Sequence, residues 1–264
     1  MALASAASPE SFAIGRVLRD TFGIIGRNIG LCLGLLSLLC GLPALILEYS
    51  VPGTLAPGSD MIETSPTVAF TALVIYTIVA FVLGIFLLGA LPRMAIDDKQ
   101  GRRPSFDGCL STGVAVALPV AVIAILTYLP VVLGIFLSAF AGTLLPYGSG
   151  IGFMLTIVLW TMLLLRWFLA IPIQVQERLG VFASLKRSAT LTKGRRWSLL
   201  GLSVVLIVVL TIAQIALGLV AMLLPANGVA FGLAVASTAW TVGMVVASTV
   251  AYLELRAARE GSRA

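Results

Sequence analysis

Two adjacent carboxylates, Asp97 and Asp98, have the spacing in this chain that comes nearest to a known chemistry. Paired acids can hold Mg²⁺ against a phosphate group. A metal motif of the DDxxD form would need an acid at position 101, where this chain has Gly101. Lys99 and Arg102 stand beside the two acids and would neutralise them. We therefore interpret this stretch as a solvated turn and not as a metal site.

Histidine is absent from all 264 residues. Its absence removes the commonest general base and metal ligand, and with it Ser/His/Asp or Cys/His catalysis within this chain. No glycine-rich stretch is followed by the GK[ST] of a phosphate loop. Cys32, Cys40 and Cys109 form no disulfide framework and are interpreted as small apolar packing residues. We therefore predict no catalytic residue, no metal site and no cofactor.

Polar residues inside the apolar stretches are the remaining candidates for function. Arg166 lies about two helical turns from the basic end of its stretch, so its side chain can extend to the membrane surface. The alternative is a buried Arg166 that pairs with Glu254 or Glu177. Gln214 lies near the middle of its stretch, and we expect it to hydrogen-bond a neighbouring helix.

Composition and length of the apolar stretches define the fold class. Hydrophobic residues make up 59% of the chain and charged residues 11%, against about 25% charged in soluble domains. A membrane-spanning helix needs roughly 20 apolar residues, and a spanning backbone must satisfy its own hydrogen bonds. We predict an all-α polytopic membrane protein, a single integral membrane domain over residues 1–264. Its six spans are 29–49, 67–91, 113–139, 150–173, 198–224 and 229–253.

The segments that connect the predicted spans alternate between basic segments and segments without Lys or Arg. All 17 Lys and Arg residues fall on one side of the predicted spans, and the other side carries only Glu48, Asp60 and Glu63. This distribution follows the positive-inside rule and predicts that both termini are cytoplasmic. The net charge of +6 comes without a basic groove or an aromatic-basic module, which argues against a nucleic-acid partner. Anionic lipid headgroups are the partner that this distribution favours.

Three segments on the basic side are amphipathic, namely 11–28, 104–112 and 180–193. Such helices usually lie in the headgroup plane, so we predict interfacial helices there. Each segment precedes a pair of spans, which suggests a threefold repeat of helix and hairpin. Pro119 and Pro130 predict a kink or tilt in the third span, and Pro43 a bend in the first.

Small residues at steps of three and four predict close packing between helices. One set leads into the first span and another follows the sixth span. The glycines of the two sets are Gly26, Gly30 and Gly34, then Gly228, Gly232 and Gly243. We expect contacts within the chain more than contacts between chains, and the sequence does not define an oligomeric state.

The densest group of cations lies between the fourth and fifth spans, in residues 177–197. Each Lys or Arg near an anionic leaflet contributes about 1 kcal/mol of attraction. The cations serve either topology alone or, because the segment is also amphipathic, binding to anionic lipid or to a membrane or cytosolic protein. The six residues are Arg178, Lys186, Arg187, Lys193, Arg195 and Arg196.

The runs 177–180 (ERLG), 184–188 (SLKRS) and 191–197 (LTKGRRW) resemble a stretch of bacterial multi-span proteins, the family of glycerophosphoryl diester phosphodiesterase membrane domains. The run 101–106 (GRRPSF) and the opening helix are similar too. The resemblance implies a membrane module. The catalytic barrel of that family uses histidines and metal-binding acids, and it has no counterpart in this chain.

These observations favour a non-enzymatic protein of the bacterial inner membrane that organises or regulates a lipid- or envelope-related partner. A carrier or channel component is the first alternative, with a path lined by Gln214 and Arg166. A membrane enzyme that acts on lipid headgroups through Asp97, Asp98 and the basic cluster is the second.

Overall fold

A computed structural model describes residues 13–50, 66–145, 147–223 and 226–260 of the chain. Every regular element in these ranges is helical, which confirms the all-α prediction. Asp60 and Glu63, two of the acids predicted on the far side, lie outside them. In chain order the helices are α1 (Ile14–Arg27), α2 (Ile29–Leu36), η1 (Ser37–Gly41), α3 (Leu42–Ser50), α4 (Pro66–Lys99), α5 (Phe106–Leu144), α6 (Gly148–Trp167), α7 (Ala170–Glu177), α8 (Val181–Leu191), α9 (Arg196–Ala221) and α10 (Ala226–Glu260).

Six helical segments of the described chain are long and apolar enough to cross a membrane, as predicted. Most run further than the sequence indicates, since α4 continues to Lys99 and α5 occupies Phe106–Leu144. The membrane-spanning segments are Ile29–Leu47, Phe70–Lys99, Phe106–Leu144, Gly148–Glu177, Arg196–Ala221 and Gly232–Arg259.

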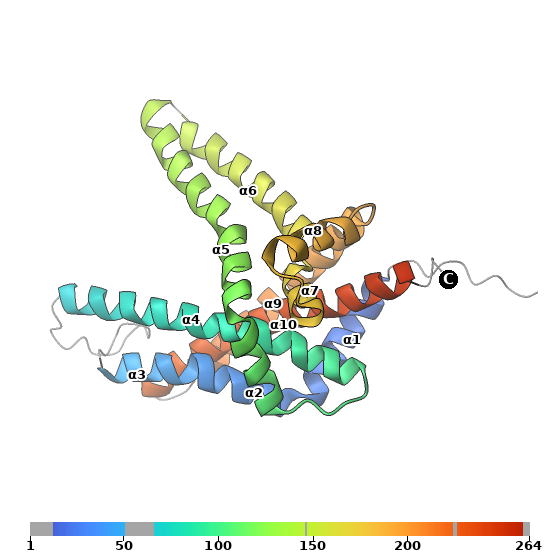
Figure 1. Ribbon diagram of the computed structural model, residues 1–264. Helices are drawn as coiled ribbons and strands as arrows, with labels where there is room; N and C mark the ends of the chain where they lie inside the picture. The colour runs from blue at the N-terminus through green and yellow to red at the C-terminus, as the bar shows by residue number, and fades with distance from the viewer. Residues whose placement is uncertain (1–12, 51–65, 146, 224–225, 261–264) are drawn as a thin grey trace, which may run out of the picture.

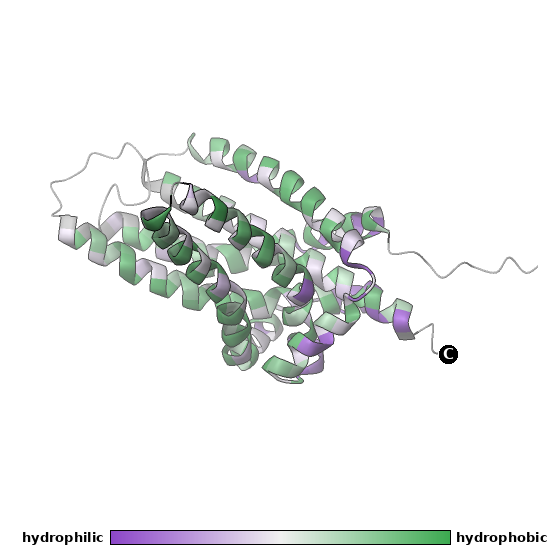
Figure 2. Ribbon diagram, turned by 90° about the horizontal axis from the view of Figure 1, so that it is seen from above, coloured by the Kyte–Doolittle hydropathy of each residue, from purple (hydrophilic) through white to green (hydrophobic). Residues whose placement is uncertain are grey.

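The spans form three hairpins, and the tip of the α5–α6 hairpin stands apart from the other two (Figure 1). The α2–η1–α3 unit and α4 pack against α10, which pairs with α9. The α5–α6 hairpin contacts the rest through α4, α7, α8 and the start of α9, and it projects at an angle to the other two (Figure 1). Hydrophilic residues gather at the end of the molecule opposite the hairpin tips, around α1, α8 and the last turns of α10 (Figure 2).

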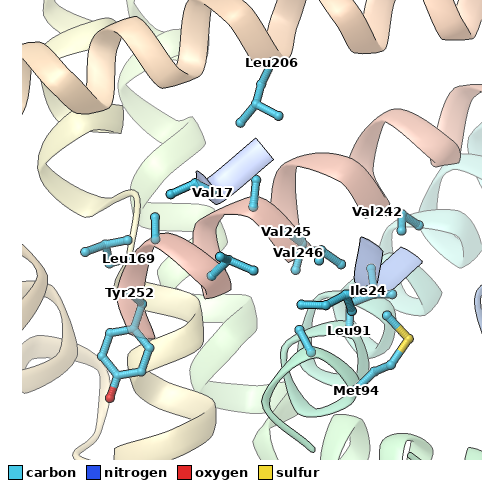
Figure 3. Close-up of a cluster of buried hydrophobic side chains, with 14 of the residues drawn as sticks. Val17, Ile24, Leu91, Met94, Leu169, Leu206, Val242, Val245, Val246 and Tyr252 are labelled. Carbon is cyan, nitrogen blue, oxygen red and sulfur yellow. The ribbon is translucent and has the colours of Figure 1, made fainter. Parts of the chain in front are cut away.

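The core lies at this hydrophilic end, and α10 runs through it (Figure 3). The stretch of α10 from Val245 to Tyr252 is buried without interruption. A helix that is buried all round needs neighbours on every side, and Val17 of α1, Leu91 of α4 and Leu206 of α9 supply them. The outer halves of α5, α6 and α9 instead expose large apolar side chains, as a lipid-facing surface does.

Helices form in two of the three segments predicted as interfacial, as α1 and α8, and each packs apolar side chains on the protein. Their place in the headgroup plane stays a prediction. Val17 and Ile24 of α1 are fully buried in the core, and Leu185 of α8 is buried beside α5 and α6. The prediction of a separate helix over 104–112 is wrong, because these residues lead directly into α5. Ser105 is the N-cap of α5, and its hydroxyl accepts a hydrogen bond from the Gly108 amide (3.1 Å).

The predicted threefold repeat therefore lacks a separate helix in its middle unit and stays a prediction. In the first span, Pro43 follows the π-helical turn η1. A proline has no N–H to donate to the carbonyl four residues earlier, and its ring clashes with that carbonyl. A π-helical turn accommodates the missing hydrogen bond. Pro119 and Pro130 both lie inside α5, which changes direction along its length (Figure 1).

Glycines bring α4, α5 and α6 into close contact, but they are not the glycines that the spacing singled out. A Cβ on Gly113 would lie 2.6 Å from the Phe86 carbonyl oxygen. Gly26 and Gly30 face open space, so contacts within the described chain do not explain their spacing, and Gly34 reaches only the Phe106 ring at 3.8 Å.

The prediction of close helix packing along the sixth span agrees better with the structure. A Cβ on Gly243 would lie 2.5 Å from Leu210, so Gly243 allows α10 to approach α9. Gly232 is half-buried in α10. The surroundings of Gly228 lie outside the described part of the chain.

We expect Gly113→Ala to lower the thermal unfolding midpoint of the detergent-solubilised protein. Forcing a methyl group into a packed interior typically costs 1–3 kcal/mol, roughly the range expected here. Gly84→Ala in α4 is the matched control, because nothing lies within 4 Å of an added Cβ there. Alanine should leave that helix unchanged or slightly more stable. Equal midpoints for the two variants would contradict the close α4–α5 contact.

Candidate functional site

Asp98, the second of the paired carboxylates, ties the end of α4 to the end of α1. The Arg27 guanidinium donates to Asp98 Oδ2 (2.6 Å), and the Asn28 amide donates to Asp98 Oδ1 (2.8 Å). The hydrogen bond to Asp98 raises the pKa of the Arg27 guanidinium above its ordinary value. Lys99 pairs with Asp20 of α1. Asp98 and Lys99 thus fasten the end of α4 to α1 and the α1–α2 junction.

Asp97 is not part of a solvated turn, so that interpretation is wrong. It belongs to the last turns of α4 and is only 8% exposed. Its carboxylate lies 2.9 Å from Arg93 Nε and 2.7 Å from an Arg102 nitrogen. The two guanidiniums beside this carboxylate offset the cost of burying its negative charge.

The fourth span breaks near its basic end, where the sequence predicts a continuous helix to residue 173. Helix α6 ends at Trp167 and α7 begins at Ala170. Pro172 has no N–H to donate to the Phe168 carbonyl, and its ring crowds that carbonyl. Ser188 of α8 bonds two other backbone groups at the break, because its hydroxyl accepts from the Leu169 amide (3.3 Å) and donates to the Arg166 carbonyl (2.9 Å).

Further polar contacts hold α8 against α7 and α10. The buried Ser184 hydroxyl donates to Gln174 Oε1 (2.8 Å). Glu177 accepts from the Tyr252 hydroxyl (2.7 Å) and lies 3.6 Å from Arg187. Arg259 of α10 donates to the Thr190 carbonyl (2.6 Å). One cation of the predicted cluster, Arg187, is therefore used in fastening α8.

Four other cations line a hollow of 610 Å³, which we call the cation pocket. Arg166 comes from the last turn of α6, Lys186 from α8, Lys193 from the following turn, and Arg196 from the first residue of α9. No acidic residue is among the described residues that line it, and none of the four cations has an ion pair within the described ranges. The pocket is therefore strongly positive.

The start of α9 adds to this positive potential. Its N-cap residue, Arg195, makes no side-chain capping bond. The first amides of a helix carry partial positive charge. Two exposed aromatic side chains flank this region, Phe182 in the lining of the pocket (78% exposed) and Trp197 beside Arg196 (85% exposed).

A second hollow, of 690 Å³, meets the cation pocket at Arg166 and Arg196, which line both. We call it the hairpin groove, because its other lining residues all come from α5 and α6. It extends along α6 from Arg166 to Gly152, toward the tip of the hairpin. Small or partly buried residues such as Gly134, Ser138 and Thr156 contribute to it, together with exposed leucines such as Leu133 and Leu159.

The remaining predicted site residues lie in different surroundings. Arg166 pairs with neither Glu254 nor Glu177, and Glu254 instead lies 3.6 Å from Arg16. Arg178 is an exposed helix cap with positive φ, and Arg195 is half-buried. Gln214 is half-buried in α9, and no hydrogen bond of its side chain appears among the described residues.

Gln214 lines neither of the two hollows described above to which Arg166 contributes, so a carrier path lined by both residues stays a prediction. The described residues contain no group of three His, Cys, Asp or Glu side chains arranged to hold a metal ion. The sequence did not indicate that Ser188 bonds the backbone at the break. It also did not indicate that Arg166 lines one pocket with the cations on and after α8. Pro172 beside a predicted span end was the available signal for the break.

Comparison with known families agrees with the resemblance carried by residues 177–197. Residues 143–254 match the family model described as the membrane domain of glycerophosphoryl diester phosphodiesterase. The match extends from the end of α5 into α10 and includes every cation of the pocket, but covers less than half of the chain. No curated protein and no solved structure matches this chain significantly.

We expect Ser188→Ala to destabilise the protein, because the Leu169 amide and the Arg166 carbonyl lose a buried partner. A buried polar group left unsatisfied costs about 1–3 kcal/mol. Ser111→Ala is the control, since the exposed Ser111 hydroxyl bonds only the Gly108 carbonyl of its own helix. Thermal unfolding in detergent measures both. A loss for Ser188→Ala no larger than the loss for Ser111→Ala would show that Ser188 does not support the break.

Proposed function

We propose that this chain is a non-catalytic module of the bacterial inner membrane whose cytoplasmic face binds anionic lipid headgroups at the cation pocket. The observation that carries the proposal is the convergence of Arg166, Lys186, Lys193 and Arg196 on one hollow with no acid in its lining. At about 1 kcal/mol for each cation near an anionic leaflet, four cations favour an anionic headgroup strongly over a neutral one.

The position of the pocket supports a headgroup as the ligand. Its cations belong to the basic ends of α6 and α9 and to α8, at the hydrophilic end of the molecule (Figure 2). By the positive-inside rule this end faces the cytoplasm, where a bacterial membrane presents phosphate-bearing headgroups. The exposed Trp197 and Phe182 suit the boundary between headgroups and hydrocarbon.

Two features support the absence of catalysis. The chain has no histidine. The paired acids Asp97 and Asp98 are held by Arg93, Arg102 and Arg27 at the junction of α4 with α1, and neither lines the cation pocket. A module of this kind suits a partner that acts on lipid headgroups, in keeping with the family whose membrane domain it matches.

We expect Lys186→Gln combined with Lys193→Gln to lower the preference of the protein for phosphatidylglycerol over phosphatidylcholine. Two lost cations remove about 2 kcal/mol at most, which corresponds to a decrease on the order of tenfold. Native mass spectrometry of protein released from nanodiscs that contain both lipids measures the bound ratio.

The matched control is Arg103→Gln combined with Arg178→Gln. Both arginines are exposed and lie outside the pocket lining, and the change in net charge is the same. Its bound ratio should stay within a factor of two or so of the unmodified protein. An equal loss in both double variants would assign lipid preference to overall charge and refute the pocket.

Topology is tested by single cysteines at Thr143, near the tip of the α5–α6 hairpin, and at Arg103, between α4 and α5. Both positions are exposed, while the native Cys32 and Cys109 are buried, and the half-buried Cys40 would be replaced by alanine. We expect a membrane-impermeant maleimide to label Thr143→Cys in bacteria with a permeabilised outer membrane, and Arg103→Cys only after the inner membrane is opened. Labelling of both from the same side would overturn the topology.

A further inference from the structure

We propose that the cation pocket and the hairpin groove form one site for a single anionic phospholipid, with the phosphate among the cations and one acyl chain along the groove. This inference rests on the proposed headgroup binding and goes further, because it assigns the tail a place on the protein. The two hollows are contiguous, since Arg166 and Arg196 line both of them.

The chemistry of the two hollows changes in the order that a phospholipid requires. The cation pocket has four positive side chains on its lining. Beyond Arg166 and Arg196, the groove has no further charged residue and is lined mainly by apolar side chains. A phosphate attached to a long apolar chain fits this sequence of surfaces, whereas a water-soluble phosphate would use only the first.

The groove is long enough for an acyl chain. Its α6 lining extends from Arg166 to Gly152, which corresponds to about 21 Å at 1.5 Å per residue. The hydrocarbon core of a bilayer is about 30 Å thick, so one leaflet provides about 15 Å. A chain anchored at the headgroup end can therefore lie in the groove across its own leaflet.

Small residues give the groove its depth. A Cβ on Gly134 would lie 2.3 Å from Thr156, and one on Gly152 would lie 2.9 Å from the Ser138 backbone. This close contact brings the α5 and α6 backbones together behind the groove. Leu133 and Leu159, each more than half exposed, stand at its sides.

Trp160 offers a reporter, because it is the tryptophan that lines the groove. We would replace Trp167, Trp197 and Trp240 by phenylalanine and place the protein in phosphatidylcholine nanodiscs. A small fraction of the lipid would be phosphatidylglycerol or phosphatidylcholine with a brominated acyl chain, which quenches nearby tryptophan. We expect brominated phosphatidylglycerol to quench Trp160 with roughly tenfold greater apparent affinity than brominated phosphatidylcholine.

Two pairs of substitutions separate headgroup from tail. Arg166→Gln with Arg196→Gln should lower several-fold the preference for the anionic lipid that Trp160 quenching measures, with Lys186 and Lys193 still in the pocket. Leu133→Phe with Leu159→Phe narrows the groove and should reduce quenching several-fold, while native mass spectrometry still finds phosphatidylglycerol preferred. Leu118→Phe is the control, since Leu118 is 78% exposed on α5 and does not line the groove.

The outcomes distinguish this inference from the proposed function. Equal quenching of Trp160 by the two brominated lipids, with phosphatidylglycerol still preferred in mass spectra, would refute the tail site and leave headgroup binding in place. Equal binding of the two lipids in both measurements would refute both proposals. Relief of the quenching by soluble glycerol 3-phosphate at the concentration of the competing lipid would show a phosphate site that needs no tail, and would overturn the composite site.

Discussion

Hydrocarbon offers no hydrogen-bond partner to a peptide group, and the arrangement of this chain follows from that constraint. Its spans are helices, and threonines such as Thr71 and Thr161 donate their hydroxyls to the carbonyl four residues earlier in the same helix. Where the fourth span breaks after Trp167, the freed groups are covered by protein, and the buried Ser188 hydroxyl bonds both sides of the break.

The cover for this break also builds the proposed lipid site. Because Ser188 must reach the Arg166 carbonyl, α8 lies directly beneath the end of α6, and Lys186 comes to line the same hollow as Arg166. Arg187 of α8 instead pairs with Glu177 of α7, which also accepts a hydrogen bond from Tyr252 of α10. Helix α8 thus uses Arg187 to hold the fold together and Lys186 to place a positive charge in the cation pocket.

Packing is uneven from one end of the molecule to the other. The hydrophilic end has a dense core around α10, with Val246 and Val250 fully buried (Figure 3). The α5–α6 hairpin projects away from the other two hairpins (Figure 1). Dispersion contacts drive helix association in a membrane, because lipid tails compete equally for apolar surfaces. The projecting hairpin therefore leaves lateral surfaces for lipid, and the hairpin groove is the one that opens onto the cation pocket.

The class of the fold and its six spans can be read from the order of the residues, because apolar length and charge alternation are properties of consecutive residues. The sequence also indicated that residues 177–197 resemble a membrane-domain family. It could not indicate that Gly113, and not Gly26, allows a close helix contact, since that depends on which faces meet. Nor could it bring Arg166 to Lys186 or lock Asp97 between two arginines, because these contacts join helices whose relative placement only tertiary packing decides.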